Sequence, residues 1–188
     1  MEIDLLRLPE DREELCRTAA DAWEGRSAAS GLPGDLFIMP FAEHPSSLCR
    51  VLRGPDGIAG CIAGTENIAK YVWWYNTRWI EVLQQRYGEV LEEGGVELDE
   101  KQVPSFAEAY PASAQVYIAP KARRNGYAKR LVLEFSRLLS EKGIPGWYME
   151  VPGHCTETMD FCSALGFSLI AWKRGVRFFG KQLPSGIQ

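Results

Sequence analysis

The clearest pattern in the chain is found in its second half, where strand-like apolar runs alternate with segments of helical periodicity. Apolar runs with strand character occupy 110–119, 146–151, 167–172 and 176–181. Residues 125–142 and 156–165 instead repeat apolar positions at helical spacing, and Gly143 and Gly166 follow these two segments as helix-ending residues. Strands and helices in this order predict a mixed α/β sheet with helices on its faces.

The first half of the chain carries similar signals. Residues 2–8 are predicted as a short strand and 10–23 as a helix, whereas 31–40 is interpreted as a loop with apolar anchors. Two further apolar runs, 47–53 and 58–63, flank the sequence Gly-Pro-Asp-Gly. Because this tetrapeptide is a strong turn signal, the two runs are predicted to form a β-hairpin.

The longest helical pattern covers residues 66–87, and Gly88 is predicted to end it. One apolar stripe of this helix includes Tyr71 and Trp79, and a second stripe lies beside it: Trp73, Ile80 and Tyr87. A helix that is apolar on two faces is buried on both or meets a partner or ligand. Core packing is favoured, while an acceptor pocket and a homodimer contact stay open. The acidic stretch 89–104 is predicted as a surface loop.

Bulk composition limits the classes of function. With 188 residues, the chain is expected to form a single domain, 1–188, with 66–104 as a helical insertion. Its 46% hydrophobic and 24% charged residues are typical of a globular protein. A net charge of −4 gives no electrostatic basis for binding duplex nucleic acid.

Cysteine and histidine usage narrows the picture further. Five scattered cysteines without a Cys-x-x-Cys pair, together with two histidines, favour neither a metal site nor a disulfide framework. We therefore expect a reducing, cytoplasmic compartment. The sequence shows no signal-peptide pattern and no membrane-spanning run, so no membrane contact is expected.

The segment that bears most on function is 114–132, where an apolar strand enters a basic turn that opens into a helix. The first N–H groups of a helix lack internal partners and carry partial positive charge, which suits a phosphate or pyrophosphate. Gly126 has no Cβ to keep the main chain away from such an anion. Arg123, Arg124 and Lys129 add positive charge at the same place. The turn predicts a phosphate-bearing cofactor.

Two motifs carry a resemblance to a known family. Residues 123–128, Arg-Arg-Asn-Gly-Tyr-Ala, match the Arg/Gln-x-x-Gly-x-Gly/Ala cofactor turn of the GNAT superfamily of acetyl-CoA-dependent acetyltransferases. Residues 161–167, Phe-Cys-Ser-Ala-Leu-Gly-Phe, are similar to that family's Phe-Tyr-x-x-Leu-Gly-Phe helix end. The likeness is best from 110 to 173. Tyr-Pro at 110–111, the inserted aromatic helix and Gly-Ile-Pro-Gly at 143–146 look like bacterial proteins related to the C-terminal acetyltransferase-like domain of animal O-GlcNAcase.

The resemblance implies an α/β (α+β) fold: a mixed, mostly antiparallel sheet of about six to seven strands, with helices on both faces. It also implies that the central strands 112–119 and 146–151 splay apart. The pantetheine arm of acetyl-CoA would lie between them and pair with exposed main-chain groups, while its pyrophosphate rests on the turn. The cofactor-binding residues implied in this way are Val116, Tyr117, Ile118, Arg123, Arg124, Asn125, Gly126, Tyr127, Ala128, Lys129, Cys155 and Phe161.

Two positions depart from the family pattern. Cys162 stands where the family often has a tyrosine that protonates the departing CoA thiolate, and Cys155 stands where an asparagine is common. A thiol of pKa about 8.5 could donate a proton to another thiolate. Cys162 is therefore a candidate acid, and a small buried residue without a catalytic role is the alternative.

The general base is expected to be Glu150, near the end of its predicted strand and beside the expected thioester. An exposed or salt-bridged strand glutamate is the alternative. Tyr148 and His154 are weaker candidates for the acid or for a water relay, and His154 could equally be an ordinary loop residue.

These residues predict an N-acetyltransferase that moves an acetyl group from acetyl-CoA to an amine of a small-molecule, peptide or protein acceptor. Positioning of amine and thioester in one cleft would supply much of the rate. Two alternatives stay open: a weak or inactive module that binds CoA or another protein, and transfer to a hydroxyl group.

Overall fold

The computed structural model describes residues 1–22, 32–93 and 98–184. Its strands are β1 Glu2–Leu5, β2 Ser47–Gly54, β3 Gly57–Thr65, β4 Ala112–Ile118, β5 Gly146–Pro152, β6 Ser168–Lys173 and β7 Val176–Gln182. They form one seven-stranded sheet in the order β1-β2-β3-β4-β5-β7-β6. Neighbouring strands are antiparallel, except that β4 and β5 are parallel. This mixed, mostly antiparallel sheet confirms the predicted fold class.

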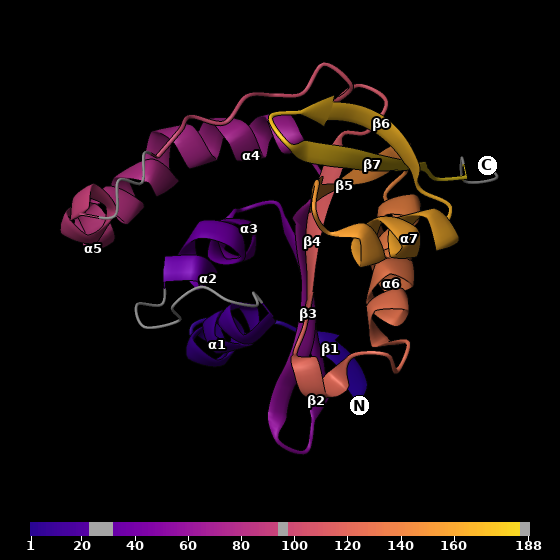
Figure 1. Cartoon of the computed structure of the whole chain (residues 1–188), viewed down its shortest axis with the longest axis horizontal. Helices are drawn as coiled ribbons and strands as arrows, with labels where there is room; N and C mark the ends of the chain where they lie inside the picture. Colours follow the sequence, from indigo (N-terminus) through magenta and orange to yellow (C-terminus); the bar gives the residue numbers. More distant parts are fainter. Residues whose placement is uncertain (23–31, 94–97, 185–188) are drawn as a thin grey trace.

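Helices cover both faces of the sheet, as Figure 1 shows. The first five α-helices lie on one side of β3 and β4, and the last two lie on the other. Their bounds are α1 Arg12–Ala22, α2 Leu32–Phe37, α3 Met39–Glu43, α4 Ile68–Trp74, α5 Ile80–Glu93, α6 Tyr127–Glu141 and α7 Thr156–Ala164. A π-helical turn, Tyr75–Trp79, joins α4 to α5, and a 3₁₀ turn, Pro120–Ala122, follows β4.

The apolar stripe of α6 builds the core on its side of the sheet. Leu131 and Phe135 are completely buried, as the helical spacing predicts. Trp147 of β5 meets the Phe135 ring edge to face at 4.9 Å, and its indole Nε1 donates to Ser136 Oγ at 3.1 Å. A buried tryptophan whose N–H has a partner anchors the start of β5 against α6.

The long helical segment α4–π–α5 builds the core on the other side. Its first apolar stripe is buried, including Tyr71, Tyr75 and Trp79. Tyr71 stacks on Phe41 of α3 with ring centroids 4.4 Å apart. The core-packing interpretation of this stripe is confirmed, and Tyr71 also lines the cavity described below. In the second stripe, Trp73 remains 64% exposed, so that part of the helix faces away from the core.

The central parallel pair is the least regular part of the sheet. β4 and β5 pair at only two positions, Ala112 with Trp147 and Ser113 with Tyr148, although each strand has seven described residues. On their outer sides, β4 pairs with β3 as far as Ile118 and β5 pairs with β7 as far as Pro152. The two strands therefore separate after their second residue pair, as the expected splay requires.

The structure corrects the interpretation of 31–40 as a loop. Residues 32–37 and 39–43 form α2 and α3, and residue 31 lies outside the described part of the chain. Pro40 stands in the first turn of α3, where a missing N–H costs nothing. Ile38 and Met39 are fully buried, so packing stabilises two helices that are too short to form alone.

Two other boundaries differ from expectation. The long helix does not end at Gly88, because α5 continues to Glu93. Gly88 is helical, and a Cβ built at this position would meet no atom within 4 Å. Its cost to the helix is therefore the extra conformational entropy that glycine loses on folding. The first strand is shorter than predicted, since β1 ends at Leu5 and a turn follows.

We expect Gly64→Ala to destabilise the fold where β3 meets the start of β4. A Cβ at Gly64 would lie 2.4 Å from the Ser113 carbonyl oxygen and 2.8 Å from Phe135 Cζ. Such overpacking against main chain lowers the free energy of unfolding by about 1–3 kcal/mol. Gly88→Ala is the control, and should raise it by about 0.5–1 kcal/mol. Urea denaturation measures both, and equal stability of the two variants would contradict this packing.

Candidate functional site

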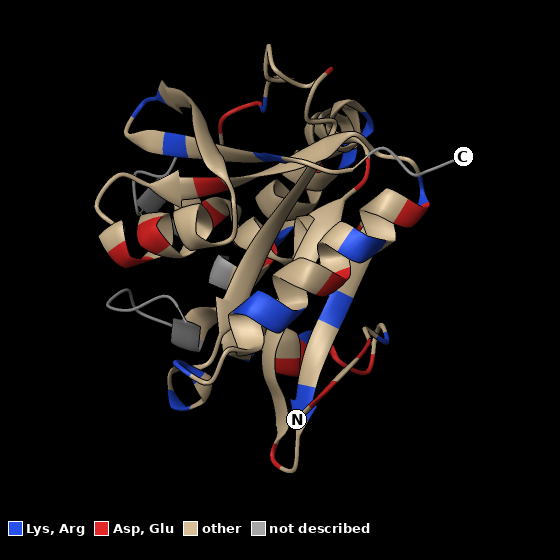
Figure 2. Ribbon diagram, turned by 90° about the vertical axis from the view of Figure 1, so that its right-hand side faces the viewer, with Lys and Arg blue, Asp and Glu red and all other residues tan. Residues whose placement is uncertain are grey.

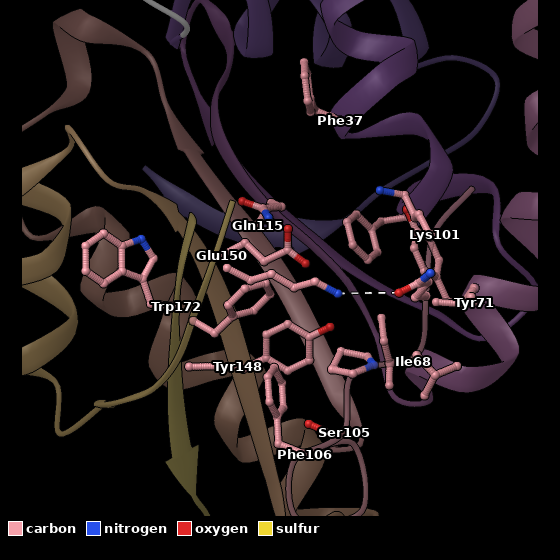
Figure 3. A pocket seen from close by; sticks show the side chains of 18 of the residues that line it. Phe37, Ile68, Tyr71, Lys101, Ser105, Phe106, Gln115, Tyr148, Glu150 and Trp172 are labelled. Atoms are coloured by element: carbon pink, nitrogen blue, oxygen red, sulfur yellow. Dashed lines mark hydrogen bonds between the residues drawn. The ribbon is translucent and has the colours of Figure 1, made fainter. Parts of the chain in front are cut away.

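A cavity of about 660 Å³ opens on the face of the sheet that carries α2 to α4. It lies between β4, β5, the β6–β7 hairpin and the loop 101–106, which closes it from the side (Figure 3). Its walls are mainly aromatic and apolar, and a few polar side chains enter it. The polar or titratable ones that matter below are Gln115, Tyr148, Glu150, Lys101, Gln102 and Lys173.

The cavity lies where the two central strands separate. Tyr148 belongs to the last β4–β5 pair, opposite Ser113, and Glu150 is two residues further along β5. Side chains two residues apart in a strand share a face, so Tyr148 and Glu150 both point into the cavity. Gln115 enters from β4 on the same face. Glu150 and Tyr148, both chosen from the sequence, thus lie in one cavity.

Glu150 is a carboxylate whose pKa is shifted by its surroundings. Its side chain is accessible from the cavity, yet the surrounding protein desolvates the carboxylate and raises its pKa above the ordinary value. The positive charge of Lys101 offsets part of this effect. A carboxyl group with a raised pKa accepts a proton more readily near neutral pH.

Tyr148 holds a phenol that burial keeps protonated. Its side chain is almost completely buried, and burial raises the pKa of the phenol, with a smaller contribution from the charge of Glu150. A hydrogen bond with the Ser113 side chain acts in the opposite direction. The ring meets Phe106 edge to face at 5.1 Å, which fixes its position. The phenol therefore keeps its proton at neutral pH.

Lys101 is a site residue that the sequence analysis missed. It lies in the stretch 89–104, which was predicted as an acidic surface loop. That prediction is wrong for residues 89–93, which belong to α5, whereas residues 98–104 have no helix or strand, and 94–97 lie outside the described residues. The Asn76 side chain holds its main chain: Asn76 Nδ2 donates to Lys101 O at 2.9 Å, and Lys101 N donates to Asn76 Oδ1 at 2.9 Å. The Lys101 Nζ lies 4.6 Å from the centroid of the Tyr75 ring. Nothing in the loop's composition predicts these contacts.

The basic turn after β4 precedes α6 as predicted. Arg124 and Gly126 have positive φ angles of 64° and 74°. Gly126 occupies the N-cap position of α6, and no side chain caps the helix. The first helical bond runs from Arg130 N to Gly126 O, at 3.1 Å. The N–H groups of residues 127–129 precede it and are the ones that a helix leaves without internal partners.

From the sequence, Gly126 is explained by the close approach of an anion, whereas the structure gives the backbone conformation as a reason for glycine at this position. A Cβ there would meet no atom within 4 Å, so steric approach of other protein groups does not require glycine. The left-handed backbone does, because only glycine adopts it without strain. Asn125 supports the turn by donating from Nδ2 to Arg123 O at 3.0 Å.

Main-chain groups of β4 face the gap at alternate residues. Ala119 N donates to Ala59 O at 2.9 Å, so the groups of residue 119 point to β3. In an antiparallel ladder the direction alternates. The main-chain groups of Tyr117 therefore also point to β3, and the expectation that they are exposed is wrong. Those of Val116 and Ile118 point toward the gap, and Ile118 O accepts from Arg123 Nε at 3.3 Å.

The remaining basic residues of the turn lie at the surface. The Arg124 guanidinium lies 3.9 Å from Glu157 Oε1, and both side chains are at least 90% exposed. Lys129 is also exposed. Tyr127 and Ala128 are partly buried in the first turn of α6. The side chains of Arg124 and Lys129 are thus exposed near the helix start, and the ion pair of Arg124 with Glu157 is at the surface.

The structure does not support Cys162 as a proton donor. Its side chain is fully buried in the core beside α6, does not line the cavity, and burial raises its thiol pKa to about 11. Cys155 occupies the N-cap position of α7 without a side-chain cap bond, and Phe161 packs against the same core. His154 is exposed and lies outside the cavity lining.

No model of a known protein family matches the chain. Solved structures do. SsHAT is 22% identical with a TM-score of 0.78, and the match covers 96% of this chain and 97% of that one. A GNAT-family protein from Desulfovibrio desulfuricans gives 13% identity and a TM-score of 0.63 over 96% and 98% of the two chains. The chain has the GNAT fold.

A third GNAT-fold neighbour was solved with a ligand. The PaiA N-acetyltransferase of Thermoplasma acidophilum, in complex with coenzyme A, is 15% identical with a TM-score of 0.60, over 97% of this chain and 99% of that one. The two sequence motifs thus predicted the fold correctly. Among the described residues, no helix is long and apolar enough to cross a membrane, and no three potential ligand side chains gather as a metal site.

Proposed function

We propose that this protein transfers the acetyl group of acetyl-CoA to an amine. The observation that carries the proposal is the separation of β4 and β5 between an uncapped helix start and a cavity that contains Glu150. The helix start suits the phosphate groups of a cosubstrate. The cavity, which contains Glu150, suits the acceptor and the base that would deprotonate it. In the proposed complex, the cosubstrate would connect the helix start to the cavity along the separated strands.

The pyrophosphate of CoA would bind at the start of α6. The N–H groups of residues 127–129 offer donors and the positive end of a helix dipole, which is worth about 0.3–1 kcal/mol at an exposed site. Arg124 and Lys129 add charge around it (Figure 2 shows this end of α6 near the basic turn). Gly126 permits the left-handed turn that directs the chain into the helix. The coenzyme A complex of the PaiA enzyme, which has the same fold, supports this choice of cosubstrate.

The pantetheine arm would extend through the gap. Val116 and Ile118 direct main-chain groups toward it, and such groups pair with the amides of an extended ligand. A thioester at the end of the arm would then reach Glu150 and Tyr148. Holding thioester and amine in one place makes the attack effectively unimolecular.

In the proposed reaction the amine nitrogen attacks the thioester carbonyl carbon. Glu150 takes the proton that the nitrogen loses as the C–N bond forms, and the tetrahedral intermediate then collapses as the C–S bond breaks. The CoA thiolate leaves and takes up the proton that Glu150 received, while the Tyr148 phenol donates a hydrogen bond to the sulfur, so both side chains end in their starting states. A thiolate of pKa about 8.5 is a good leaving group, so the base matters more than the acid. A lysine-type amine costs about 4.6 kcal/mol to deprotonate at pH 7, an α-amine only about 1.

Gly126→Glu is expected to abolish binding of acetyl-CoA while leaving the fold intact. The substitution strains the left-handed backbone and places a carboxylate where the pyrophosphate would rest. Gly143→Glu is the matched control, because Gly143 has a φ of 70° and no neighbour within 4 Å at the other end of α6. Acetyl-CoA at 100 times its Kd should raise the stability of the wild type and the control by about 2.7 kcal/mol. Equal stabilisation of the Gly126 variant would refute the pyrophosphate site.

Glu150→Gln is expected to lower kcat/KM by about 100-fold at neutral pH, without weakening acetyl-CoA binding. In the wild type kcat/KM should rise with pH as Glu150 loses its proton, along a limb above the ordinary value of 4.5. The variant should lack this limb. Release of CoA thiol with a panel of primary amines and peptide N-termini measures the effect, with the exposed Glu81→Gln as control. Binding of acetyl-CoA without thiol release across the panel would instead indicate a CoA-binding module.

A further inference from the structure

The loop that carries Lys101 is fixed to the π-helical turn rather than held by its own structure. Asn76, in that turn, pairs its side-chain amide with both main-chain groups of Lys101, at 2.9 Å each. Tyr75, the preceding residue, presents its ring to the Lys101 ammonium at 4.6 Å. π-Helical turns often occur at functional sites. Here the turn sets the position of one cation in the cavity.

No carboxylate contacts that cation among the residues that the structure describes. Burial lowers the pKa of Lys101, and Glu150 attracts it only from a distance. Other lysines find partners: Lys142 Nζ lies 2.8 Å from Glu66 Oε2, and Lys121 Nζ lies 3.5 Å from Asp56 Oδ2. Lys101 lines the cavity and stays exposed to solvent there, so an anionic group of a ligand can reach its ammonium. Figure 3 shows the Lys101 side chain directed across the cavity toward Gln115 and Glu150.

A second cation enters the same cavity from the β6–β7 hairpin. Lys173 Nζ approaches Gln102 Oε1 at 3.5 Å, the dashed contact in Figure 3. The cavity therefore presents two ammonium groups, from Lys101 and Lys173, and one carboxylate, from Glu150. A ligand that complements this set carries one positive and one negative group.

The walls indicate the rest of the ligand. Tyr71, Phe106 and Phe178 offer aromatic surface around the polar groups. The volume of about 660 Å³ lies within the range of small-molecule sites, and the thioester would occupy part of it. An apolar or aromatic body of the size of one amino-acid side chain fits such a lining.

We propose that Lys101 binds the carboxylate of the acceptor, and that the acceptor is an amino acid with an apolar or aromatic side chain. The amine would face Glu150, the carboxylate would face Lys101 with Lys173 nearby, and the side chain would pack against Tyr71 and Phe106. The assignment of the amine rests on the proposed acetyltransferase function. The carboxylate site itself requires no acetyl transfer.

Product analogues test this site by binding alone. N-acetylphenylalanine carries the carboxylate, and N-acetylphenethylamine is the same molecule without it. Calorimetric titration of the wild type should show the first binding at least about tenfold more tightly than the second. In Lys101→Met the ratio should fall to within about twofold, because the methylene stem is kept and the charge is lost. Lys101→Arg should keep the preference, as should Lys70→Met, an exposed lysine outside the cavity lining.

Three outcomes would overturn the proposal. They are no binding of N-acetylphenylalanine or N-acetylleucine at about 10 mM, a preference that survives in Lys101→Met, and binding of N-acetyl-O-phosphoethanolamine in place of the carboxylates. Thermal melting of Lys101→Met without ligand checks that the variant folds. If the protein does not bind acetyl-CoA but prefers the carboxylate analogue, only the acetyltransferase proposal is refuted. If it binds acetyl-CoA but shows no preference for the carboxylate analogue, only the carboxylate site is refuted.

Discussion

The short pairing between β4 and β5 is the constraint on which the rest of the structure depends. β4 forms a continuous ladder with β3, and β5 forms one with β7, yet the two meet only at Ala112–Trp147 and Ser113–Tyr148. Both strands are thus held firmly on their outer sides while their facing edges part. Main-chain groups along those edges, such as those of Val116 and Ile118, cannot be satisfied by the neighbouring strand. Arg123 Nε satisfies the Ile118 carbonyl, and in the proposed complex the extended cosubstrate would pair with the groups of Val116.

The two ends of the gap have complementary chemistry. At one end, the uncapped start of α6 and its basic turn favour an anion. At the other, the cavity holds Glu150, whose pKa is raised by desolvation, and Lys101, whose pKa is lowered by it. Desolvation strengthens the interaction of each group with a ligand of opposite charge. One extended cosubstrate between the strands would therefore bring its reactive end to the acceptor groups.

Much of this arrangement could be predicted from local sequence. The α6 stripe that includes Leu131 and Phe135 follows the 3.6-residue period, and the turn with Gly126 needs only neighbouring residues. The position of Glu150 was predictable because strand alternation places it on the same face as Tyr148. These are properties that short stretches of chain determine.

The features that could not be predicted depend on contacts between distant segments. Lys101 enters the cavity because Asn76, 25 residues earlier, holds its main chain. No local pattern encodes that pairing or the π-helical turn that contains Asn76. Cys162 is buried in the core that the apolar stripe of α6 helps to form, and the sequence of its own helix does not reveal this burial. Gly88 does not end α5, since a glycine weakens a helix by only about 1 kcal/mol.

Amide hydrogen exchange with and without acetyl-CoA tests the central claim most directly. If the cosubstrate lies in the gap, the amides of Tyr127, Ala128 and Lys129 at the helix start and those of Val116 and Ile118 on β4 should exchange more slowly in its presence. The amide of Tyr117, which points to β3, should change much less. Unchanged exchange at both the helix start and β4 with acetyl-CoA bound would contradict the account, because the ligand would then occupy another part of the protein.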